Sequence, residues 1–275
     1  MKECDHNCGN CEKNRDGTCK GQEASFAAPA NSKSKIGKVV AVMSGKGGVG
    51  KSLVTQMLAV AARRRGLKTA ILDADITGPS IPTAFGILER ASGDADGNVL
   101  PCRSRTGIEI MSLNLLVEDS KDPVVWRGPV IAGAVKQFWS EVFWGDIDIM
   151  FVDMPPGTGD VPLTVFQSLP VSGAVVVSSP QDLVKLIVEK AVRMAGMMNI
   201  PVLGLVENMS SFKCPGCGAT HRIFGDSKIK QLGGEYGISA LAEIPMDAEI
   251  AKAVDAGMVE DVDVSAIEGI LDALV

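Results

Sequence analysis

The clearest chemistry in this sequence lies in the stretch SGKGGVGKS at residues 44–52, which carries two lysines, Lys46 and Lys51. Residues 45–52 match G-x-x-x-x-G-K-[ST], the pattern of a loop whose backbone N–H groups surround phosphate oxygens. In that pattern the lysine at position 51 reaches the β- and γ-phosphates, and the hydroxyl of Ser52 binds Mg²⁺. The sequence therefore predicts a nucleotide loop made of Gly45, Lys46, Gly47, Gly48, Val49, Gly50, Lys51, Ser52 and the next residue, Leu53.

The second lysine, Lys46, is more than the pattern needs. It stands at the entrance of the loop, where a side chain can point outward toward a facing subunit. A cation supplied in trans accelerates phosphoryl transfer by roughly 10³–10⁵-fold where one is used. Lys46 thus favours a hydrolase that completes its site by forming a homodimer, although a solvated loop lysine is the simpler alternative.

Acidic residues follow two apolar runs that read as buried strands. Asp153 ends IDIMFVD (147–153) and precedes MPPGTGD, a segment suited to a switch loop, while Asp73 and Asp75 end TAILDAD (69–75). The carboxyl ends of parallel strands meet at one edge of a sheet, where ligands bind. We expect Asp153 to act with the loop, and Asp75 to orient the attacking water or support Mg²⁺. Taken singly, Asp75 is an ordinary loop acid or helix cap.

The elements that must position these residues alternate between strands and helices. This alternation predicts an α/β fold with a doubly wound, mainly parallel sheet of P-loop NTPase type and helices on both faces. Residues 1–37 read as a cysteine-containing flexible tail and residues 38–275 as one P-loop domain. The uncharged run 161–181 is interrupted by Pro162, Pro170 and Gly173, which indicates a loop, a short helix and a strand. The expected strands are 38–43, 69–75, 108–114, 147–153, 173–179, 201–207 and 240–245, and the expected helices are 51–65, 130–143, 181–198, 247–256 and 264–274.

The amino-acid composition limits the classes of partner that this chain is expected to bind. The chain has 275 residues, a net charge of −6 and only 4% aromatic residues. An acidic chain with few aromatics argues against general nucleic-acid binding, which needs a basic face and stacking platforms. The start MKECDHNCGN has no apolar segment typical of a signal peptide. We expect a cytoplasmic protein with no nucleic-acid or membrane partner.

Seven cysteines in a cytoplasmic chain are expected to be thiols or metal ligands. Cys214 and Cys217 form CPGC, which alone fits zinc, a redox dithiol or an iron–sulfur site. Four thiolates complete a zinc or [4Fe–4S] site, and a two-fold dimer would supply two from each subunit. His221 nearby could be a ligand, but the favoured interpretation is a surface histidine that makes hydrogen bonds. Cys102 is interpreted as a structural or idle thiol.

Four further cysteines, Cys4, Cys8, Cys11 and Cys19, lie in the tail. They could hold a second [4Fe–4S] cluster or a zinc ion, or belong to a thiol-rich tail without metal. The first three have the spacing of a radical-SAM cluster motif, but a P-loop pattern follows them rather than a barrel.

The loop GKGGVGKS resembles the deviant Walker A loop of the family that includes nitrogenase iron protein and the MinD/ParA ATPases. Within that family the chain closely resembles the Mrp/ApbC type of iron–sulfur cluster carrier, over residues 38 to about 250. One departure is Leu53, where the family usually has threonine. The matching stretches are DADITGPSIP (73–82), WRGP (126–129), DIMFVDMPPGTGD (148–160), SSPQDL (178–183), GLVENMSSFKCPGCG (204–218), IFG (223–225) and EIPMD (243–247).

The resemblance implies a homodimer that binds ATP and Mg²⁺ and contacts nucleotide across the dimer through Lys46. It implies that Asn208 and the backbone near Pro245 border adenine; the guanine signature N-K-x-D is missing from the sequence. It also implies a labile [4Fe–4S] cluster bridged by Cys214 and Cys217, received from a cluster scaffold or donor and passed to apo iron–sulfur proteins.

Two other functions remain open at this point. One is a partitioning or positioning ATPase of MinD/ParA type, although the C-terminal VEDVDVSAIEGILDALV lacks the basic residues of a membrane-binding helix. The other is a nitrogenase-like ATP-dependent reductase, whose cluster ligands are separated single cysteines rather than a CxxC pair.

Overall fold

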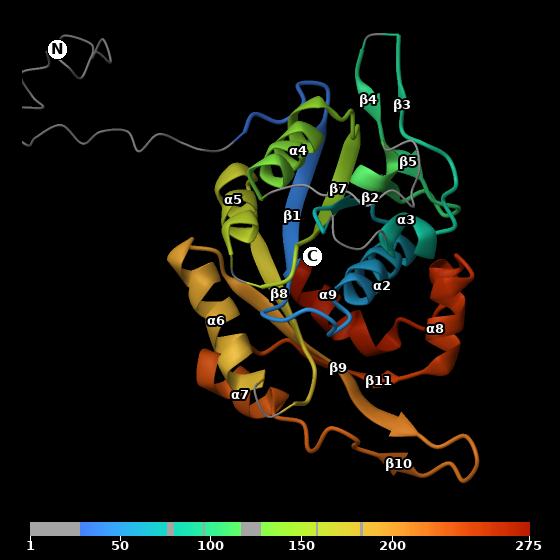
Figure 1. Ribbon diagram of the computed structural model, residues 1–275, viewed down its shortest axis with the longest axis vertical. Coiled ribbons are helices and arrows are strands. Elements are labelled where there is room, and N and C mark those ends of the chain that lie inside the picture. The colour runs from blue at the N-terminus through green and yellow to red at the C-terminus, as the bar shows by residue number, and fades with distance from the viewer. Residues whose placement is uncertain (1–27, 76–79, 96, 117–127, 158, 182–183) are drawn as a thin grey trace, which may run out of the picture.

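A computed structural model describes residues 28–75, 80–95, 97–116, 128–157, 159–181 and 184–275. Within these ranges, nine strands form one sheet with the order β10-β9-β8-β1-β7-β2-β6-β5, and β11 pairs with β9 (Figure 1). Only β5 and β10 pair antiparallel in it. The strands are β1 (Lys35–Met43), β2 (Thr69–Asp73), β5 (Cys102–Arg103), β6 (Glu109–Ser112), β7 (Asp146–Asp153), β8 (Gly173–Ser178), β9 (Val202–Lys213), β10 (Thr220–His221) and β11 (Leu241–Met246).

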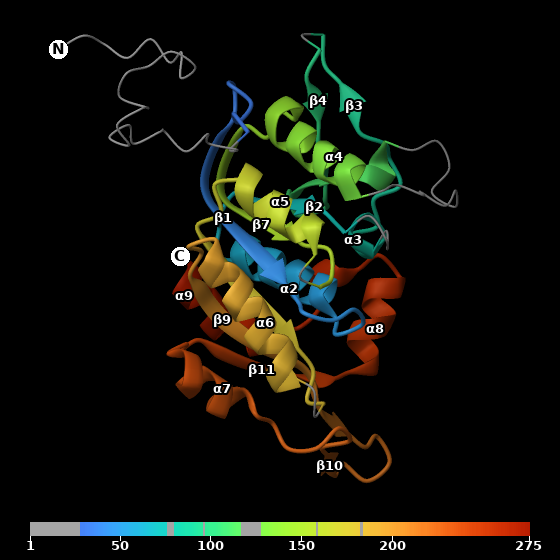
Figure 2. The ribbon, with the colours of Figure 1, turned by 60° about the vertical axis from the view of Figure 1, so that its left-hand side comes forward.

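Helices cover both faces of this sheet (Figures 1 and 2). On one face, α4 (Gly128–Glu141), α5 (Asp160–Ser168), α6 (Val184–Met197) and α7 (Ile229–Tyr236) share a core with the inward side chains of β1, β7 and β8. On the other, α2 (Lys51–Arg64), α3 (Ser80–Ala84) and α9 (Glu268–Leu274) form a second core, with α8 (Ala248–Asp255) at its edge. The central strands are buried on both sides, which is why they read as continuous apolar runs. The expected doubly wound α/β fold is confirmed.

The structure adds elements that carry little apolar periodicity in the sequence. A two-stranded sheet of β3 (Ser92–Gly93) and β4 (Val99–Leu100), the short helix α3 and the helix α7 were not expected. Strand β9 continues to Lys213, six residues past the expected end at 207, because its last part forms a hairpin with β10. This extension contains Asn208, Ser210 and Ser211 among its residues, so no apolar run marks it in the sequence.

Among the described residues, secondary structure and tertiary contacts already occur before the expected boundary after residue 37. Strand β1 starts at Lys35, and the indole Nε1 of Trp139 donates to the carbonyl of Ala28 at 3.1 Å. The run 161–181 contains the expected short helix, α5, followed by strand β8. Among the helices of the described ranges, none has the length and apolar character needed to cross a membrane.

A close contact between two glycines fixes α8 against α3. Gly257 has a φ of 72°, and a Cβ at this position would lie 2.7 Å from the Cα of Gly86. The contact leaves no room for a side chain, and the backbone conformation disfavours one. Helix α8 also borders the pocket described below, so this packing matters to the site.

We predict that Gly257→Ala lowers the free energy of unfolding by about 2–4 kcal/mol, from left-handed strain plus overpacking. Gly66→Ala is the matched control, because Gly66 has a φ of 85° and a Cβ added there would meet no atom within 4 Å. Gly66→Ala should lower the free energy of unfolding by only about 1–2 kcal/mol, from backbone strain alone. Urea unfolding of both variants measures the difference; equal losses would contradict the packing role.

Candidate functional site

The glycine loop joins β1 to α2 at the carboxyl edge of the sheet. Gly50 is the N-terminal cap of α2, with a φ of 80°, and a Cβ there would lie 2.1 Å from the Nδ2 atom of Asn208. Glycine is thus required both by backbone conformation and by the approach of β9. The loop leads into a helix N-terminus, whose free N–H groups and partial positive charge favour phosphate.

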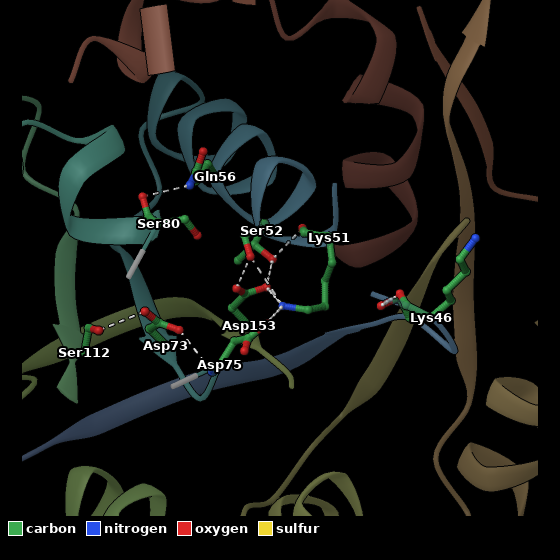
Figure 3. A network of polar contacts seen from close by, with 11 residues as sticks. Lys46, Lys51, Ser52, Gln56, Asp73, Asp75, Ser80, Ser112 and Asp153 are labelled. Atoms are coloured by element: carbon green, nitrogen blue, oxygen red, sulfur yellow. Dashed lines mark hydrogen bonds and ion pairs between the residues drawn. The ribbon is translucent and has the colours of Figure 1, made fainter. Parts of the chain in front are cut away.

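Lys51 is buried and its ammonium faces two carboxylates (Figure 3). Its Nζ lies 2.7 Å from Oδ1 of Asp153 and 3.2 Å from Oδ2 of Asp75. These residues come from α2, the end of β7 and the segment after β2, and β7 pairs with β2 in the sheet. The topology therefore brings together the residues that the sequence placed at separate strand ends.

Asp153 is fully buried and its oxygens are nearly all occupied. Besides Lys51, Ser52 Oγ donates to Oδ2 at 2.6 Å and Thr55 Oγ1 donates to Oδ1 at 2.8 Å. Burial raises the pKa of Asp153, whereas Lys51 and the two hydroxyls act in the opposite direction. Thr55 was missed by the sequence analysis; its position four residues after Lys51, on the same helix face, is the signal that could have found it.

Asp73 lies behind this site, next to Asp153 on the neighbouring strand. It lies opposite Asp153 in the β2–β7 register, and it accepts hydrogen bonds from Ser112 Oγ at 2.8 Å and from the Asp75 backbone at 3.0 Å. Burial, and then the charge of Asp153, raise the pKa of Asp73 well above its usual range. Through the Asp75 backbone, Asp73 fixes where the segment after β2 leaves the sheet.

The oxygen ligands at this edge of the sheet suit a magnesium ion bound together with a nucleotide. Ser52 offers a hydroxyl, and Asp153 and Asp75 offer carboxylates, which are the hard oxygen ligands that Mg²⁺ prefers. All three lie at the N-terminus of α2 within one hydrogen-bonded group (Figure 3).

Lys46 is placed quite differently from Lys51. It is exposed, its side chain points away from the Lys51–Asp153 group, and its Nζ donates to Oε1 of Gln181 at 2.7 Å (Figure 3). A single surface hydrogen bond of this kind is easily exchanged for another partner. The two lysines of the loop therefore have separate surroundings within one chain.

A mainly apolar pocket of about 520 Å³ opens beside the loop. Asn208 connects the two, since its Nδ2 donates to the carbonyl of Val49 at 3.0 Å. A larger cavity of about 640 Å³ lies at the opposite end of the sheet, around Thr69 and Asp146, and no loop residue lines it. The pocket beside the loop is lined by Leu53, Asn208, Met209, Phe212, Pro245, Met246, Asp247, Ala248, Ile250, Ala251, Val254 and Asp255.

Cys214 and Cys217 lie in the turn of the β9–β10 hairpin, which projects from the body (Figures 1 and 2). The turn is closed by hydrogen bonds from the Cys214 N–H to Ala219 and from the Gly218 N–H to Cys214, both 2.8 Å long. The backbone N–H groups of Cys217 and Gly216 point at the Cys214 sulfur and lower its pKa, so they stabilise a thiolate.

This hairpin supplies two thiols and no further ligand. Cys217 is exposed and unpaired as a disulfide, and His221 is exposed on β10. Across the described ranges, no three His, Cys, Asp or Glu residues gather into a metal site. One chain thus offers half of a four-thiolate site here.

The remaining cysteines are not part of this hairpin. Cys102 is buried in β5, where burial raises its pKa, which suits a structural thiol. Cys4, Cys8, Cys11 and Cys19 lie outside the described residues.

Comparison with known proteins extends this picture. The ParA family model, described as NUBPL iron-transfer P-loop NTPase, matches residues 35–274. The chain belongs to this family. It is therefore a nucleotide-binding P-loop NTPase, in agreement with the resemblance found in its motifs.

Relatives across the family cover most of the chain. An iron-sulfur cluster carrier protein of Methanocaldococcus jannaschii is 41% identical over 263 residues, covering 94% of this chain and 90% of the relative. The iron-sulfur protein required for NADH dehydrogenase, mitochondrial, of Arabidopsis thaliana is 42% identical over 221 residues, covering 80% of this chain and 70% of the relative.

Solved structures show the same fold. The nucleotide-binding protein of Archaeoglobus fulgidus in complex with ADP is 44% identical, with a TM-score of 0.75 over 83% of this chain and 89% of that chain. The cell division ATPase MinD of Pyrococcus furiosus has a TM-score of 0.62 over 86% of this chain and 98% of its own, at 17% identity. At that identity the MinD likeness shows the fold alone.

The buried charges predict different stability effects for the two loop lysines. We expect Lys51→Ala to lower the free energy of unfolding of the nucleotide-free protein by about 3–5 kcal/mol, because it leaves the Asp153 carboxylate without its counter-ion. Lys46→Ala, the control in the same loop, should change it by less than about 0.5 kcal/mol. Chemical unfolding at neutral pH measures both; equal stability of the two variants would contradict the ion pair.

Proposed function

We propose that this chain is an ATP-dependent iron–sulfur cluster carrier that binds a [4Fe–4S] cluster between two copies of itself and transfers it to apo-proteins. The observation that carries this proposal is the projecting Cys214–Cys217 turn, which offers two free thiols on a P-loop NTPase fold. Four thiolates complete the cluster, and a two-fold axis through the turn would provide them.

The names of similar proteins support the proposal that the carried group is an iron–sulfur cluster. Proteins of Methanocaldococcus jannaschii and Clostridium perfringens that are 41% and 40% identical to this chain are named iron-sulfur cluster carrier proteins. The family description, iron-transfer P-loop NTPase, agrees with those names. A cluster scaffold or donor would load the carrier, and apo iron–sulfur proteins would receive from it.

We further propose that the nucleotide is ATP and that the chain hydrolyses it slowly. Lys51 would bind the β- and γ-phosphates after leaving its carboxylate partners, and Ser52 and Asp153 would hold Mg²⁺. Asp75 would orient the attacking water. Lys46 would reach the phosphates of the facing subunit, because it is exposed and its surface hydrogen bond to Gln181 can be exchanged for a phosphate.

The apolar pocket beside the loop is the proposed adenine site, bordered by Leu53, Asn208 and Pro245. Leu53 adds apolar surface where relatives of this type usually have a hydroxyl, which suits contact with a flat ring. A cytoplasmic location is proposed from the free thiols of half-buried Cys214 and exposed Cys217, which persist in a reducing compartment.

We predict that Lys46→Ala keeps nucleotide binding but loses hydrolysis by roughly 10³-fold, because a trans contact to the phosphates is removed while Lys51 remains. Fluorescent-nucleotide titration and phosphate release measure the two effects separately. Lys51→Ala and Asp153→Ala are the comparison variants, and both should lose turnover. If Lys46→Ala loses binding as severely as Lys51→Ala, then Lys46 works within its own subunit and the trans role is wrong.

We predict that Cys214→Ser or Cys217→Ser alone abolishes the bridging cluster, because the two-fold repeat removes two of four thiolates at once. Iron per dimer after anaerobic reconstitution, and transfer to an apo-enzyme, measure the loss. A single exchange should be almost as severe as the double one.

The tail cysteines provide the control for this experiment. Replacing Cys4, Cys8, Cys11 and Cys19 together should leave the bridging cluster in place. A full, transferable cluster in either single CxxC variant would refute the carrier mechanism, and loss of transfer in the tail variant alone would move the working cluster to the tail.

A further inference from the structure

Strand β9 runs without interruption from the pocket beside the loop to the cysteine turn. Asn208, Met209 and Phe212 line the pocket, and Cys214 follows two residues after Phe212. A molecule that fills this pocket therefore lies against the strand that leads to the first cysteine.

The backbone of β9 changes conformation in the middle of this stretch. Met209 has a φ of 60°, a left-handed conformation that is costly for a long side chain and that only Asn199 shares among the described non-glycine residues. The pairing with β11 shifts at the same point: Ile244 lies opposite Asn208, but Met246 lies opposite Phe212. Two residue steps on β11 thus span four on β9, which is a β-bulge at Met209.

The strand is firmly held before the bulge. Asn208 donates to the loop carbonyl of Val49 at 3.0 Å, and the carboxylate of buried Glu207 accepts hydrogen bonds from the Ser227 side chain and the Lys228 backbone. These contacts come from opposite sides, one from the nucleotide loop and the other from the segment that leaves the hairpin.

The strand has fewer partners after Phe212, its last residue that pairs with β11. Beyond Phe212, the antiparallel register joins only Phe212 and Lys213 to Thr220 and His221. Residues 213 and 215–226 are exposed, and the hairpin projects away from the sheet (Figures 1 and 2). Met209 therefore lies in the bulge, three residues before Phe212, where the strand pairs again with β11. The arm beyond Phe212 is joined to β11 by the ion pair of Arg222 with Glu243, at 3.5 Å.

We propose that Met209 is a positioning residue that sets the direction of the Cys214–Cys217 arm according to whether a nucleotide base fills the pocket. A base would press on Met209 and Phe212, on either side of the bulge, and so favour one conformation of the backbone between them. A ligand shifts such an equilibrium only through different contacts with the two conformations, and the pocket provides them. This inference rests on the proposed use of the pocket for the nucleotide base.

Hydrogen exchange of the full-length, metal-free, reduced protein tests this arrangement. Amides of residues 210–222 should exchange about fivefold more slowly with saturating Mg–ADP or Mg–AMPPNP, the low end of ordinary coupling between sites. Met209→Gly should bind both nucleotides yet lose this difference, because glycine adopts either conformation freely and no longer transmits the contact. Glycine suits a positive φ, so the variant is expected to fold.

Two variants separate positioning from simple pocket contact. Met209→Leu keeps the side-chain bulk and should keep the nucleotide-dependent exchange. Val254→Ala removes an apolar contact from the same pocket on α8, so it should weaken affinity while the hairpin still responds at saturation.

The outcomes are distinct. If wild-type protein binds nucleotide but the hairpin exchanges equally with and without it, the positioning role is wrong and the proposed function stands. The same holds if Met209→Gly keeps the response. If wild-type protein binds neither nucleotide, both the positioning role and the proposed function fail.

Discussion

The site depends on a buried lysine that needs an anionic partner in every state of the protein. The ammonium of Lys51 is enclosed at the start of α2, and Asp153 neutralises it at 2.7 Å. An isolated buried charge costs several kcal/mol, so each of the two side chains requires the other when no phosphate is present. The sheet order β1-β7-β2 meets this requirement, because it places the end of β7 directly beneath the helix that follows β1.

Two further polar residues, Asp73 and Ser112, lie behind this ion pair. Asp73, on the neighbouring strand, lies beside Asp153 and is held by Ser112 from the next strand along. The charge of Asp153 adds to burial in raising the pKa of Asp73, and the hydrogen bond from the Ser112 hydroxyl acts in the opposite direction. A nucleotide phosphate that takes Lys51 away from Asp153 would leave a carboxylate and a hydroxyl facing the same space, which is the environment that Mg²⁺ favours.

The sequence predicts this part of the molecule well because each residue follows a strong local pattern. The loop is a fixed motif, and Asp153 and Asp75 end apolar runs, so parallel topology alone brings them to one edge. The identity of the hydroxyl partners does not follow in this way. Thr55 reaches Asp153 because it lies one helical turn after Lys51, a spacing that has meaning only once the helix is placed over Asp153, and Ser112 reaches Asp73 through the β2–β6 register.

Other parts of the fold lack a signal for a different reason. The β9–β10 hairpin is exposed and polar, so burial leaves no periodic pattern in its residues. The bulge at Met209 goes with the shift in the β9–β11 pairing, and nothing in the local sequence favours a positive φ at methionine. The contact of Gly86 with Gly257 joins residues far apart in the chain, and neither position reveals its partner.

The exposure of the cysteine turn fits the task of giving a cluster away. Structural metal sites are closed, with all four ligands supplied by one folded unit, and removing their metal costs folding energy. Here each chain would contribute two ligands from a projecting arm, so releasing the cargo opens a dimer contact and leaves both hydrophobic cores intact. The backbone N–H groups at Cys214 stabilise the thiolate without enclosing it. A site built in this way would hold a cluster between two subunits and still present it to a third protein, and the same strand contacts the nucleotide loop through Asn208.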